Sequence, residues 1–345
     1  MGEDRPAAPL AVAVVGGGSW GTALAVHRAR LGGDVRLWVR DPGRAAAIAQ
    51  AGRNERYLPG VVVAPPVRVT GSARHALAGA GIVVVAVPSH GVGEVMGRLA
   101  PEVPEGAVVL SATKGLDPVT GLRVSQLLAR ILPGRPIAAL SGPSFAREVA
   151  AGLPAALVVA SEDEEVARGI QRSLATREFR LYTNRDITGV ELAGALKNVM
   201  AIAAGIGDSL GLGDNARAAL VTRGLVEMTR IGVAAGASAR TFAGLAGVGD
   251  LVLTCTGVLS RNRALGLALG SGKSLAEAEA ASPMVAEGAR TAVPALALAR
   301  RAGVSAPICE AVAAVLSGTV APAEALATLL SRELRPEEEG SLQRA

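Results

Sequence analysis

A glycine-rich turn near the start of the chain limits the possible folds more than any other feature. The valine-rich run 10–15 leads directly into Gly16-Gly17-Gly18-Ser19-Trp20-Gly21, and an alanine- and leucine-rich segment follows. The spacing G-x-G-x-x-G in this setting predicts a strand, a tight turn and a helix. Gly16 would form the turn, Gly18 would let the backbone approach a pyrophosphate, and Gly21 would let helix and strand pack closely. Because free N–H groups at a helix start bind phosphate, Ser19 and Trp20 are candidate cofactor contacts.

The first 190 residues repeat this alternation. Apolar runs recur at 35–39, 67–70, 82–87, 107–110, 137–141 and 156–160, and helix-like segments lie between them at 20–31, 42–51, 91–99, 122–131 and 164–175. Strands that are apolar along their whole length are typical of a parallel sheet covered on both faces by helices. The pattern therefore predicts an α/β fold with a Rossmann-type, doubly wound and mostly parallel sheet.

The pattern changes after about residue 186. Helix-like segments occupy 190–206, 216–234, 241–244, 263–269, 275–281, 293–302, 308–317 and 322–330, and no convincing strand follows. Several of these segments are apolar all round, which indicates burial inside a helical domain. We therefore predict a dinucleotide-binding domain at 1–189, an all-helical substrate-binding domain at 190–332 and a solvated tail at 333–345.

Composition excludes several classes of protein. Half of the 345 residues are hydrophobic, so the chain is not intrinsically disordered. Cys255 and Cys309 are the only cysteines, which excludes a disulfide scaffold and fits the reducing cytoplasm, where we place the protein. The net charge is only +5 and aromatic residues make up 2%, so we expect no nucleic-acid partner. The start MGEDRPAAP lacks the apolar core of a signal peptide, and we expect no stable membrane insertion.

The glycine turn also permits a hydrolase interpretation. Residues 17–21 read G-x-S-x-G, the pattern of a nucleophile elbow around Ser19. That fold needs a histidine late in the chain, whereas the three histidines here are His27, His75 and His90. Dinucleotide binding is therefore the strongly favoured interpretation.

Two further motifs are weaker. Gly142-Pro143-Ser144 looks like an elbow but has no histidine after it. Gly270-Ser271-Gly272-Lys273-Ser274 ends like a P-loop, but it lacks the first glycine of that motif and follows a helix, so we interpret it as a loop between helices. The scattered histidines and cysteines show no metal-ligand spacing, so we expect no metal.

The end of the second predicted strand bears on the choice between the two nicotinamide cofactors. An acidic residue there would bind the ribose 2′-hydroxyl of NAD, and an arginine would bind the 2′-phosphate of NADP. Arg40 occupies this position and Asp41 follows it. We therefore favour NADP, with NAD and a merely exposed charged turn left open.

Some polar residues interrupt apolar segments, where burial without a partner costs about 1–3 kcal/mol. Lys197 and Asn198 lie in the apolar stretch 192–206, and Asp250 stands between Gly247-Val248-Gly249 and Leu251-Val252-Leu253. Lys114 follows a predicted strand at its carboxyl end, where doubly wound sheets bind ligands. From the residues alone, Lys197 and Asp250 form either a buried salt bridge or part of a site.

With these residues in place, the chain closely resembles the bacterial NAD(P)-dependent glycerol-3-phosphate dehydrogenases from about Val12 to Ser317. The resemblance rests on GGGSWGTALA (16–25), NERYLPG (54–60), VPSH (87–90), SATKGL (111–116), LSGPSFAREVAAGLPAALVVAS (140–161), GVELAGALKN (189–198), TFAGLAGVGDLVLTCTGVLSRNR (241–263) and VAEGARTA (285–292). The departures are small: Ala155 replaces a frequent threonine, and Gly17 replaces an alanine.

The resemblance implies reversible reduction of dihydroxyacetone phosphate by NAD(P)H to sn-glycerol 3-phosphate, a precursor of glycerophospholipids. It implies that Lys197 donates the proton to the ketone oxygen, that Asp250 orients Lys197, and that Lys114 adds positive charge beside substrate and cofactor. An ammonium at this position stabilises and protonates the oxygen on which charge develops. Thr254 would be a supporting hydroxyl, and Cys255 a small buried residue without a chemical role.

The same resemblance assigns the other contacts. The substrate would meet Gly142, Ser144, Ser260, Arg261 and Asn262, with Arg261 offering a planar fork to phosphate. The cofactor would meet Ala146, Arg261, Val285, Glu287 and Lys114, besides the glycine turn and Arg40. We expect the site between the two domains and a homodimer as the assembly. The alternatives are another two-domain hydroxyacid or sugar-acid dehydrogenase, or a non-catalytic dinucleotide-binding protein.

Overall fold

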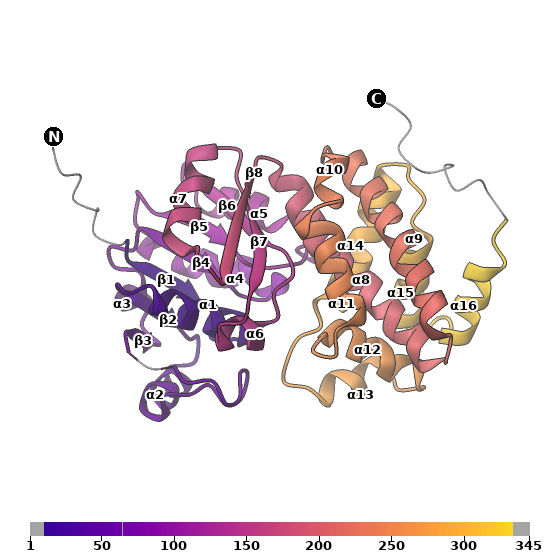
Figure 1. Cartoon of the computed structure of the whole chain (residues 1–345), viewed down its shortest axis with the longest axis horizontal. Helices are drawn as coiled ribbons and strands as arrows, with labels where there is room; N and C mark the ends of the chain where they lie inside the picture. Colours follow the sequence, from indigo (N-terminus) through magenta and orange to yellow (C-terminus); the bar gives the residue numbers. More distant parts are fainter. Residues whose placement is uncertain (1–9, 64, 334–345) are drawn as a thin grey trace.

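An eight-stranded sheet forms the first part of the protein (Figure 1). The structure is a computed structural model that describes residues 10–63 and 65–333. Its strands are β1 (Val12–Val15), β2 (Val35–Trp38), β3 (Val67–Thr70), β4 (Ile82–Val85), β5 (Val108–Ser111), β6 (Ile137–Ser141), β7 (Ala155–Ala160) and β8 (Phe179–Asn184). Their order is β3-β2-β1-β4-β5-β6-β7-β8, and every neighbouring pair is parallel except β6 and β7. The predicted Rossmann-type, mostly parallel sheet is confirmed.

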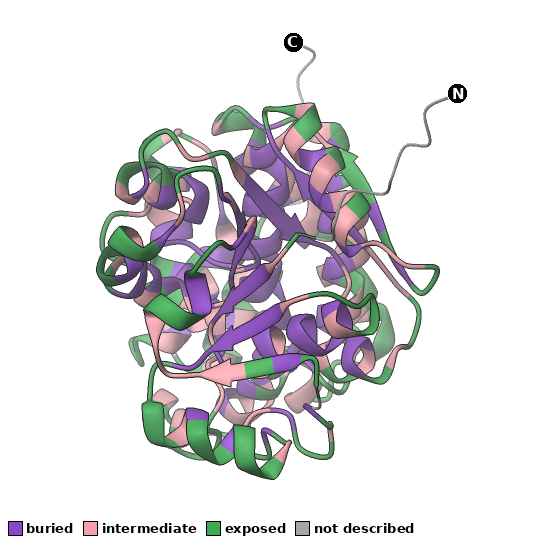
Figure 2. Ribbon diagram, turned by 90° about the vertical axis from the view of Figure 1, so that its left-hand side faces the viewer, coloured by how far each residue is buried: buried purple, intermediate pink, exposed green. Residues whose placement is uncertain are grey.

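Helices cover both faces of this sheet, because successive strand residues point to opposite sides. Val12 and Val14 of β1 join a core with α1 (Ser19–Arg30), α2 (Pro42–Ala51), α6 (Ala146–Ala151) and α7 (Glu164–Leu174). Ala13 and Val15 join a second core with α3 (Ala73–Leu77), α4 (Val92–Leu99) and α5 (Val124–Ile131). Figure 2 shows the buried strands between helices whose outer faces are exposed.

The second part is helical through residue 333. It contains α8 (Ile187–Ser209), α9 (Gly213–Ala234), α10 (Ala239–Phe242), a π-helical turn (Leu245–Gly249), α11 (Asp250–Thr256), α12 (Arg261–Gly270), α13 (Leu275–Ala280), α14 (Glu287–Arg301), α15 (Pro307–Leu316) and α16 (Pro322–Leu330). Helix α8 runs through its core and packs against α9, α11, α12 and α14. Gly205 of α8 and Gly266 of α12 face each other so closely that an added Cβ would meet the opposite backbone at 2.1 Å. Small residues therefore allow this close packing.

Helix α8 is long and apolar enough to cross a membrane, but 94% of its most apolar window is buried inside the protein. It is therefore accounted for as a core helix, which passes the same test of length and composition.

Several elements differ from the sequence prediction. Strand β8 was missed because Arg180 and Tyr182 point outward from this edge strand, so it lacks a continuous apolar run. The short helices α3 and α6 were missed, as was α11, whose glycine-rich approach hid its start at Asp250. Helix α14 begins at Glu287 rather than at Val293. The division into two domains at residue 189 stays a prediction. The N-terminal segment that we expect not to be a signal peptide lies outside the described residues. Most of the tail predicted at 333–345 also lies outside them.

Candidate active site

The glycine turn brings β1 and α1 into direct contact. An added Cβ at Gly21 would meet the Gly16 carbonyl oxygen at 1.9 Å, and one at Gly16 would meet the Ala86 carbonyl oxygen at 2.6 Å. No atom lies within 4 Å of the corresponding position at Gly18, so the backbone there faces open space. The turn is held by Asn54, whose Nδ2 donates to the Gly17 carbonyl oxygen at 3.0 Å. It therefore has the shape that a pyrophosphate needs.

Other groups around the turn also fit a dinucleotide. The buried indole Nε1 of Trp20 finds no hydrogen-bond partner among the described residues, which leaves a donor available in the first turn of α1. Beyond β2, the Asp41 carboxylate caps α2 by accepting from Arg44 N at 2.7 Å. Arg40 is exposed and makes no polar contact within the described part of the chain. The glycine turn and the available Trp20 donor thus fit a dinucleotide.

Three charged side chains from three elements meet at the junction of the two parts. Lys197 Nζ of α8 lies 3.0 Å from Asp250 Oδ1 of α11, and Lys114 Nζ of the β5–α5 loop lies 2.8 Å from Asp250 Oδ2. Lys197 also donates to Thr254 Oγ1 at 2.7 Å. Lys197 and Asp250 are buried, and Lys114 is 16% exposed. The cluster holds two ammonium groups and one carboxylate, so its formal charge is positive.

Burial sets the protonation behaviour of this cluster. It lowers the pKa of Lys197 to about 8, and the Lys114 charge acts in the same direction while Asp250 opposes both. Burial also acts to raise the pKa of the Asp250 carboxyl, but the charges of Lys114 and Lys197 outweigh it and hold that pKa below its usual range. Lys197 can therefore exchange a proton near neutral pH beside a permanently ionised Asp250.

The loop after β6 lies directly beside this cluster. Lys114 Nζ donates to the Gly142 carbonyl oxygen at 2.7 Å and to Ser144 Oγ at 3.3 Å. Ala146 begins α6 immediately after this loop. The structure thus brings Gly142 and Ser144 to Lys114, while their predicted contact with the substrate stays a prediction.

A chain of amide hydrogen bonds links α12 and α14 to the cluster. Asn198 Nδ2 donates to the Lys114 carbonyl oxygen at 3.1 Å, and Asn262 Nδ2 donates to Asn198 Oδ1 at 2.8 Å. Asn262 Oδ1 in turn accepts from Gly288 N at 2.9 Å. Ser260 caps α12 by accepting from Arg263 N at 3.2 Å. Ser260 and Asn262 are therefore buried structural partners here, next to the position proposed for the substrate.

Arg261 and Glu287 mark the outer side of the same region. Desolvation by burial lowers the pKa of the Arg261 guanidinium, and the Glu287 charge opposes that change. Glu287 Oε2 accepts from Ser89 Oγ at 2.6 Å and Oε1 accepts from Ser89 N at 3.2 Å. Burial raises the pKa of Glu287, and the bonds from Ser89 oppose the rise. Val285 lies in the segment just before Glu287.

Sequence reasoning assigned no role to three residues that shape this region. Asn54 and Ser89 belong to motifs shared with the family, and Asn198 is a polar residue in an apolar helix. Buried polar side chains need partners, so an asparagine beside Lys197 was the one available signal. No group of histidine, cysteine or acidic residues within the described chain could hold a metal ion. Burial raises the pKa of Cys255 to about 12, which leaves it an inert thiol.

Comparison with known proteins decides the family. Residues 11–167 match the family model described as NAD-dependent glycerol-3-phosphate dehydrogenase N-terminus, and residues 186–327 match the corresponding C-terminus. The chain belongs to the NAD-dependent glycerol-3-phosphate dehydrogenase family. This membership argues against the hydrolase interpretation, and Gly270–Ser274 connects α12 to α13 as expected for a loop.

Relatives in this family match along most of their length. A glycerol-3-phosphate dehydrogenase (NAD(P)+) of Geobacter sulfurreducens is 48% identical over 329 residues, covering 94% of this chain and 98% of the relative. One of Thioalkalivibrio sulfidiphilus is 50% identical over 327 residues, covering 94% and 98%. The crystal structure of glycerol-3-phosphate dehydrogenase from Coxiella burnetii is 40% identical with a TM-score of 0.90, covering 94% of this chain and 99% of the other. A ketopantoate reductase family protein of Ralstonia eutropha shares the fold at 16% identity and a TM-score of 0.60.

Proposed function

We propose that this protein catalyses the NAD(P)-dependent, reversible reduction of dihydroxyacetone phosphate to sn-glycerol 3-phosphate. The observation that carries the proposal is the buried Lys197–Asp250–Lys114 cluster at the carboxyl ends of β5 and β6, in a chain of the glycerol-3-phosphate dehydrogenase family. When bound, the reduced nicotinamide supplies a hydride to the carbonyl carbon.

In reduction, Lys197 acts as the general acid. The carbonyl oxygen gains negative charge, and an ammonium held by Asp250 both stabilises that charge and donates a proton to it. A pKa of about 8 makes Lys197 a stronger acid than an ordinary lysine while it remains mostly protonated at neutral pH. In oxidation the neutral amine accepts the proton from the alcohol. Lys114 Nζ lies 2.8 Å from Asp250 Oδ2 and adds a second positive charge beside the site.

Dihydroxyacetone phosphate carries a phosphate group, which a simple hydroxyacid substrate lacks. Arg261 is the first residue of α12, and its planar guanidinium can bind phosphate oxygens in pairs. Ser260, Asn262, Gly142 and Ser144 are proposed to complete the substrate contacts. This arrangement favours a phosphorylated ketone over a simple carboxylate, which is the preference that separates the proposal from other two-domain dehydrogenases.

For the cofactor we propose Gly16, Gly18, Ser19, Trp20 and Gly21 as the pyrophosphate contacts. Ala146, Val285 and Glu287 are proposed as further contacts, with Lys114 and Arg261 reaching both ligands. Use of NAD or NADP follows from the family, and an unpaired Arg40 supports a preference for NADP.

The test is turnover of dihydroxyacetone phosphate, followed by the loss of absorbance at 340 nm with each reduced cofactor. Lys197→Met keeps the length of the side chain but removes its proton, so turnover should fall by about 10²–10⁴-fold while cofactor affinity is retained. Near-normal turnover by this variant would remove the proposed role. Binding of cofactor without any turnover by the wild-type chain would favour the non-catalytic alternative instead.

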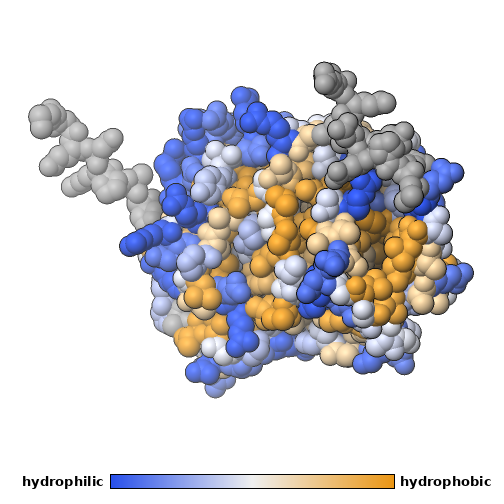
Figure 3. All heavy atoms as spheres, turned by 45° about the vertical axis from the view of Figure 1, so that its right-hand side comes forward, coloured by the Kyte–Doolittle hydropathy of each residue, from blue (hydrophilic) through white to orange (hydrophobic). Residues whose placement is uncertain are grey.

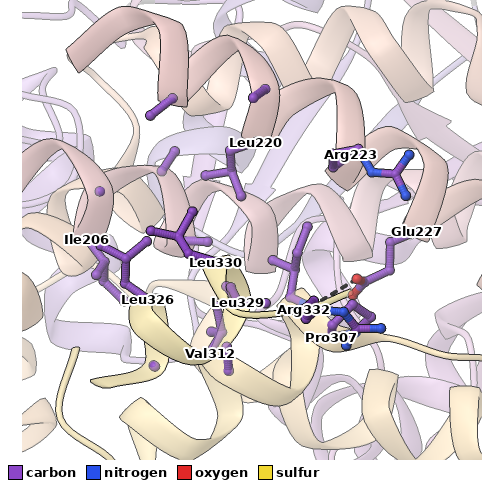
Figure 4. A pocket seen from close by; sticks show the side chains of 18 of the residues that line it. Ile206, Leu220, Arg223, Glu227, Pro307, Val312, Leu326, Leu329, Leu330 and Arg332 are labelled. Atoms are coloured by element: carbon purple, nitrogen blue, oxygen red, sulfur yellow. Dashed lines mark hydrogen bonds between the residues drawn. The ribbon is translucent and has the colours of Figure 1, made fainter. Parts of the chain in front are cut away.

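We also propose that the protein works as a homodimer. A hollow of about 1400 Å³ lies between α8, α9, α15 and α16, and none of the proposed site residues lines it. Figure 3 shows the apolar surface over this helical side, and Figure 4 shows Leu220, Leu326 and Leu330 lining the hollow. An apolar area of this kind on a soluble enzyme commonly marks a protein interface.

The charges around this hollow support a second copy of the chain as the occupant. Its wall carries Arg217, Arg223, Arg230 and Arg332 together with Asp208, Glu227 and Glu333. A two-fold interface places the same patch on both partners, so mixed charge can be complementary to itself.

Cytoplasmic location and supply of glycerol 3-phosphate to glycerophospholipid synthesis complete the proposal. They rest on the family and on the cysteine content of the chain.

A further inference from the structure

A buried carboxylate on α8 is used by none of the steps above. Glu191 lies in the helix that carries Lys197, and its side chain is only 4% exposed. Its Oε1 accepts a hydrogen bond from Ser125 N at 2.8 Å, and its Oε2 lies 2.7 Å from Arg123 Nη1. Ser125 Oγ also donates to Oε2. Ser125 is in the first turn of α5, which packs on the sheet. The Glu191 carboxylate of the helical part therefore binds the start of a helix that belongs to the first part of the protein.

Arg123 and Ser125 end the loop that carries Lys114. This loop runs from β5 to α5 and is closed by an isolated bridge between Leu116 and Arg123. Leu116 is fully buried in the core of the helical part. Lys114 stands two residues before Leu116, so a shift of Arg123 is passed on to Lys114 over a short length of chain.

The same face of α8 holds the other end of the loop. Residues 191, 194 and 198 recur at a spacing of three and four, so they share one side of the helix. Gly194 lies close under the loop, because an added Cβ there would meet Ser141 Oγ at 2.5 Å and Lys114 Cγ at 3.7 Å. Asn198 donates to the Lys114 carbonyl oxygen at 3.1 Å. Lys114 is thus fixed between two polar attachments to α8.

We infer that Glu191 is a positioning residue that clamps the Lys114 loop to α8 and so keeps Lys114 and Lys197 on the same Asp250 carboxylate. It touches neither substrate nor cofactor in this scheme. Burying a carboxylate costs desolvation free energy. For Glu191, one ion pair and two hydrogen bonds offset that cost. The inference rests on the proposed function, because it concerns the geometry of the proton donor.

Loss of the Glu191 contacts should shift the pKa of Lys197 in a definite direction. The charged and titratable groups that act on Lys197 are Asp250 and Cys255 from α11 and Lys114 from the loop. If Lys114 withdraws, Lys197 loses a repelling charge and has Asp250 to itself, so its pKa rises. Loss of stability alone would leave that pKa unchanged.

The test is Glu191→Gln, which keeps the shape and one acceptor but removes the charge that holds Arg123. We expect kcat/KM for dihydroxyacetone phosphate to fall by about 10–100-fold at neutral pH through misplacement of the site. The fall in reduction rate at high pH should move to higher pH. Affinity for NADPH, read by its fluorescence, should change little, because the phosphate turn is elsewhere.

Glu227→Gln is the matched control. Glu227 is also a buried carboxylate, and it accepts from Ile308 N and Cys309 N, each at 2.9 Å, at the start of α15. It should lower the melting temperature without moving the pH profile. An unmoved profile in Glu191→Gln, with activity lost only in proportion to folded protein, would overturn the inference.

The two proposals can fail separately. If the wild-type chain does not reduce dihydroxyacetone phosphate, the proposed function fails. The clamp can still be read from the rate at which a lysine reagent labels residue 197 as a function of pH, measured by peptide mass spectrometry. Labelling curves that coincide for wild type and Glu191→Gln would overturn the clamp alone.

Discussion

The Asp250→Asn substitution tests the charge cluster most directly. Asparagine keeps the shape of the side chain but removes the charge that lies 3.0 Å from Lys197 and 2.8 Å from Lys114. At an effective dielectric constant of about 20, one such contact is worth roughly 5 kcal/mol before desolvation is subtracted. Asp250 is the main group that raises the pKa of Lys197 against burial. We therefore expect the pKa of Lys197 in this variant to lie below about 8.

The expected result is a displaced pH profile in both directions of reaction. Reduction needs protonated Lys197, so its rate should fall at a lower pH than in the wild type. Each unit by which the pKa drops below the assay pH lowers the protonated fraction about tenfold. Oxidation needs the neutral amine, so its rate should reach its plateau at a lower pH. The measurement is kcat/KM between pH 6 and 10, in each direction, by absorbance at 340 nm.

Stability should change less than the loss of an ion pair suggests. Holding Lys197 protonated in the wild type costs about 3 kcal/mol, since its pKa falls from 10.5 to about 8 at about 1.4 kcal/mol per unit. In the variant at pH 7.5, Lys197 can lose its proton at a cost of about 4 kcal/mol relative to the unfolded chain. The additional destabilisation through Lys197 is thus limited to about 1 kcal/mol.

Asp208→Asn is the control for this experiment. Asp208 is another poorly exposed carboxylate shared by two cations, Arg217 and Arg263, each at 2.7 Å. Its substitution should reduce the free energy of unfolding without displacing the pH profile. Should Asp250→Asn keep a profile centred near pH 8, the electrostatic reasoning about the cluster is wrong.

Three further substitutions test other parts of the proposal. Arg40→Ala should weaken NADPH binding about tenfold more than NADH binding, by loss of a charge-assisted contact, and equal effects on both in a fluorescence titration would contradict the 2′-phosphate assignment. Arg261→Lys should lower kcat/KM for dihydroxyacetone phosphate about tenfold more than it lowers kcat/KM for dihydroxyacetone, since only the former carries phosphate. Leu330→Glu, at a side chain that is 75% exposed, should turn a dimer into a monomer in size-exclusion chromatography with light scattering. Val119→Glu, at an apolar side chain that is 90% exposed, should not; a dimer that survives Leu330→Glu would argue against the α16 face.

The sequence predicted the central sheet well because its strands carry a strong local signal. The apolar run 137–141 begins and ends as expected, since both faces of this strand are buried. Strand β8 carries no such signal, because one of its faces is open to solvent and its residues alternate. The start of α14 at Glu287 was missed because the apolar stretch begins several residues later than the helix.

The sequence identified some site residues individually, but it did not reveal how they contact one another. Lys197 and Asp250 stood out because a charge inside an apolar segment needs a partner, and the family resemblance gave each a role. Their common contact with Lys114 depends on how α8, α11 and the β5–α5 loop come together in space, which no local pattern encodes. No local pattern indicates the role of Glu191, because its partners Arg123 and Ser125 are more than sixty residues away in sequence.

The fold alone does not select this reaction, because ketopantoate reductase family proteins share it at 16% identity. Selection comes from polar groups that the helical part keeps buried at the edge of the sheet. A buried lysine in α8 without these partners would lower the stability of the protein, and no neighbouring charge would adjust its pKa to the reaction. When Lys197 shares the Asp250 carboxylate with Lys114, it becomes an acid of suitable strength beside a second positive charge. Because Lys114 belongs to the sheet part and Asp250 to the helical part, this tuning exists only while the two parts are held in register, which is the task assigned here to Glu191 and Asn198.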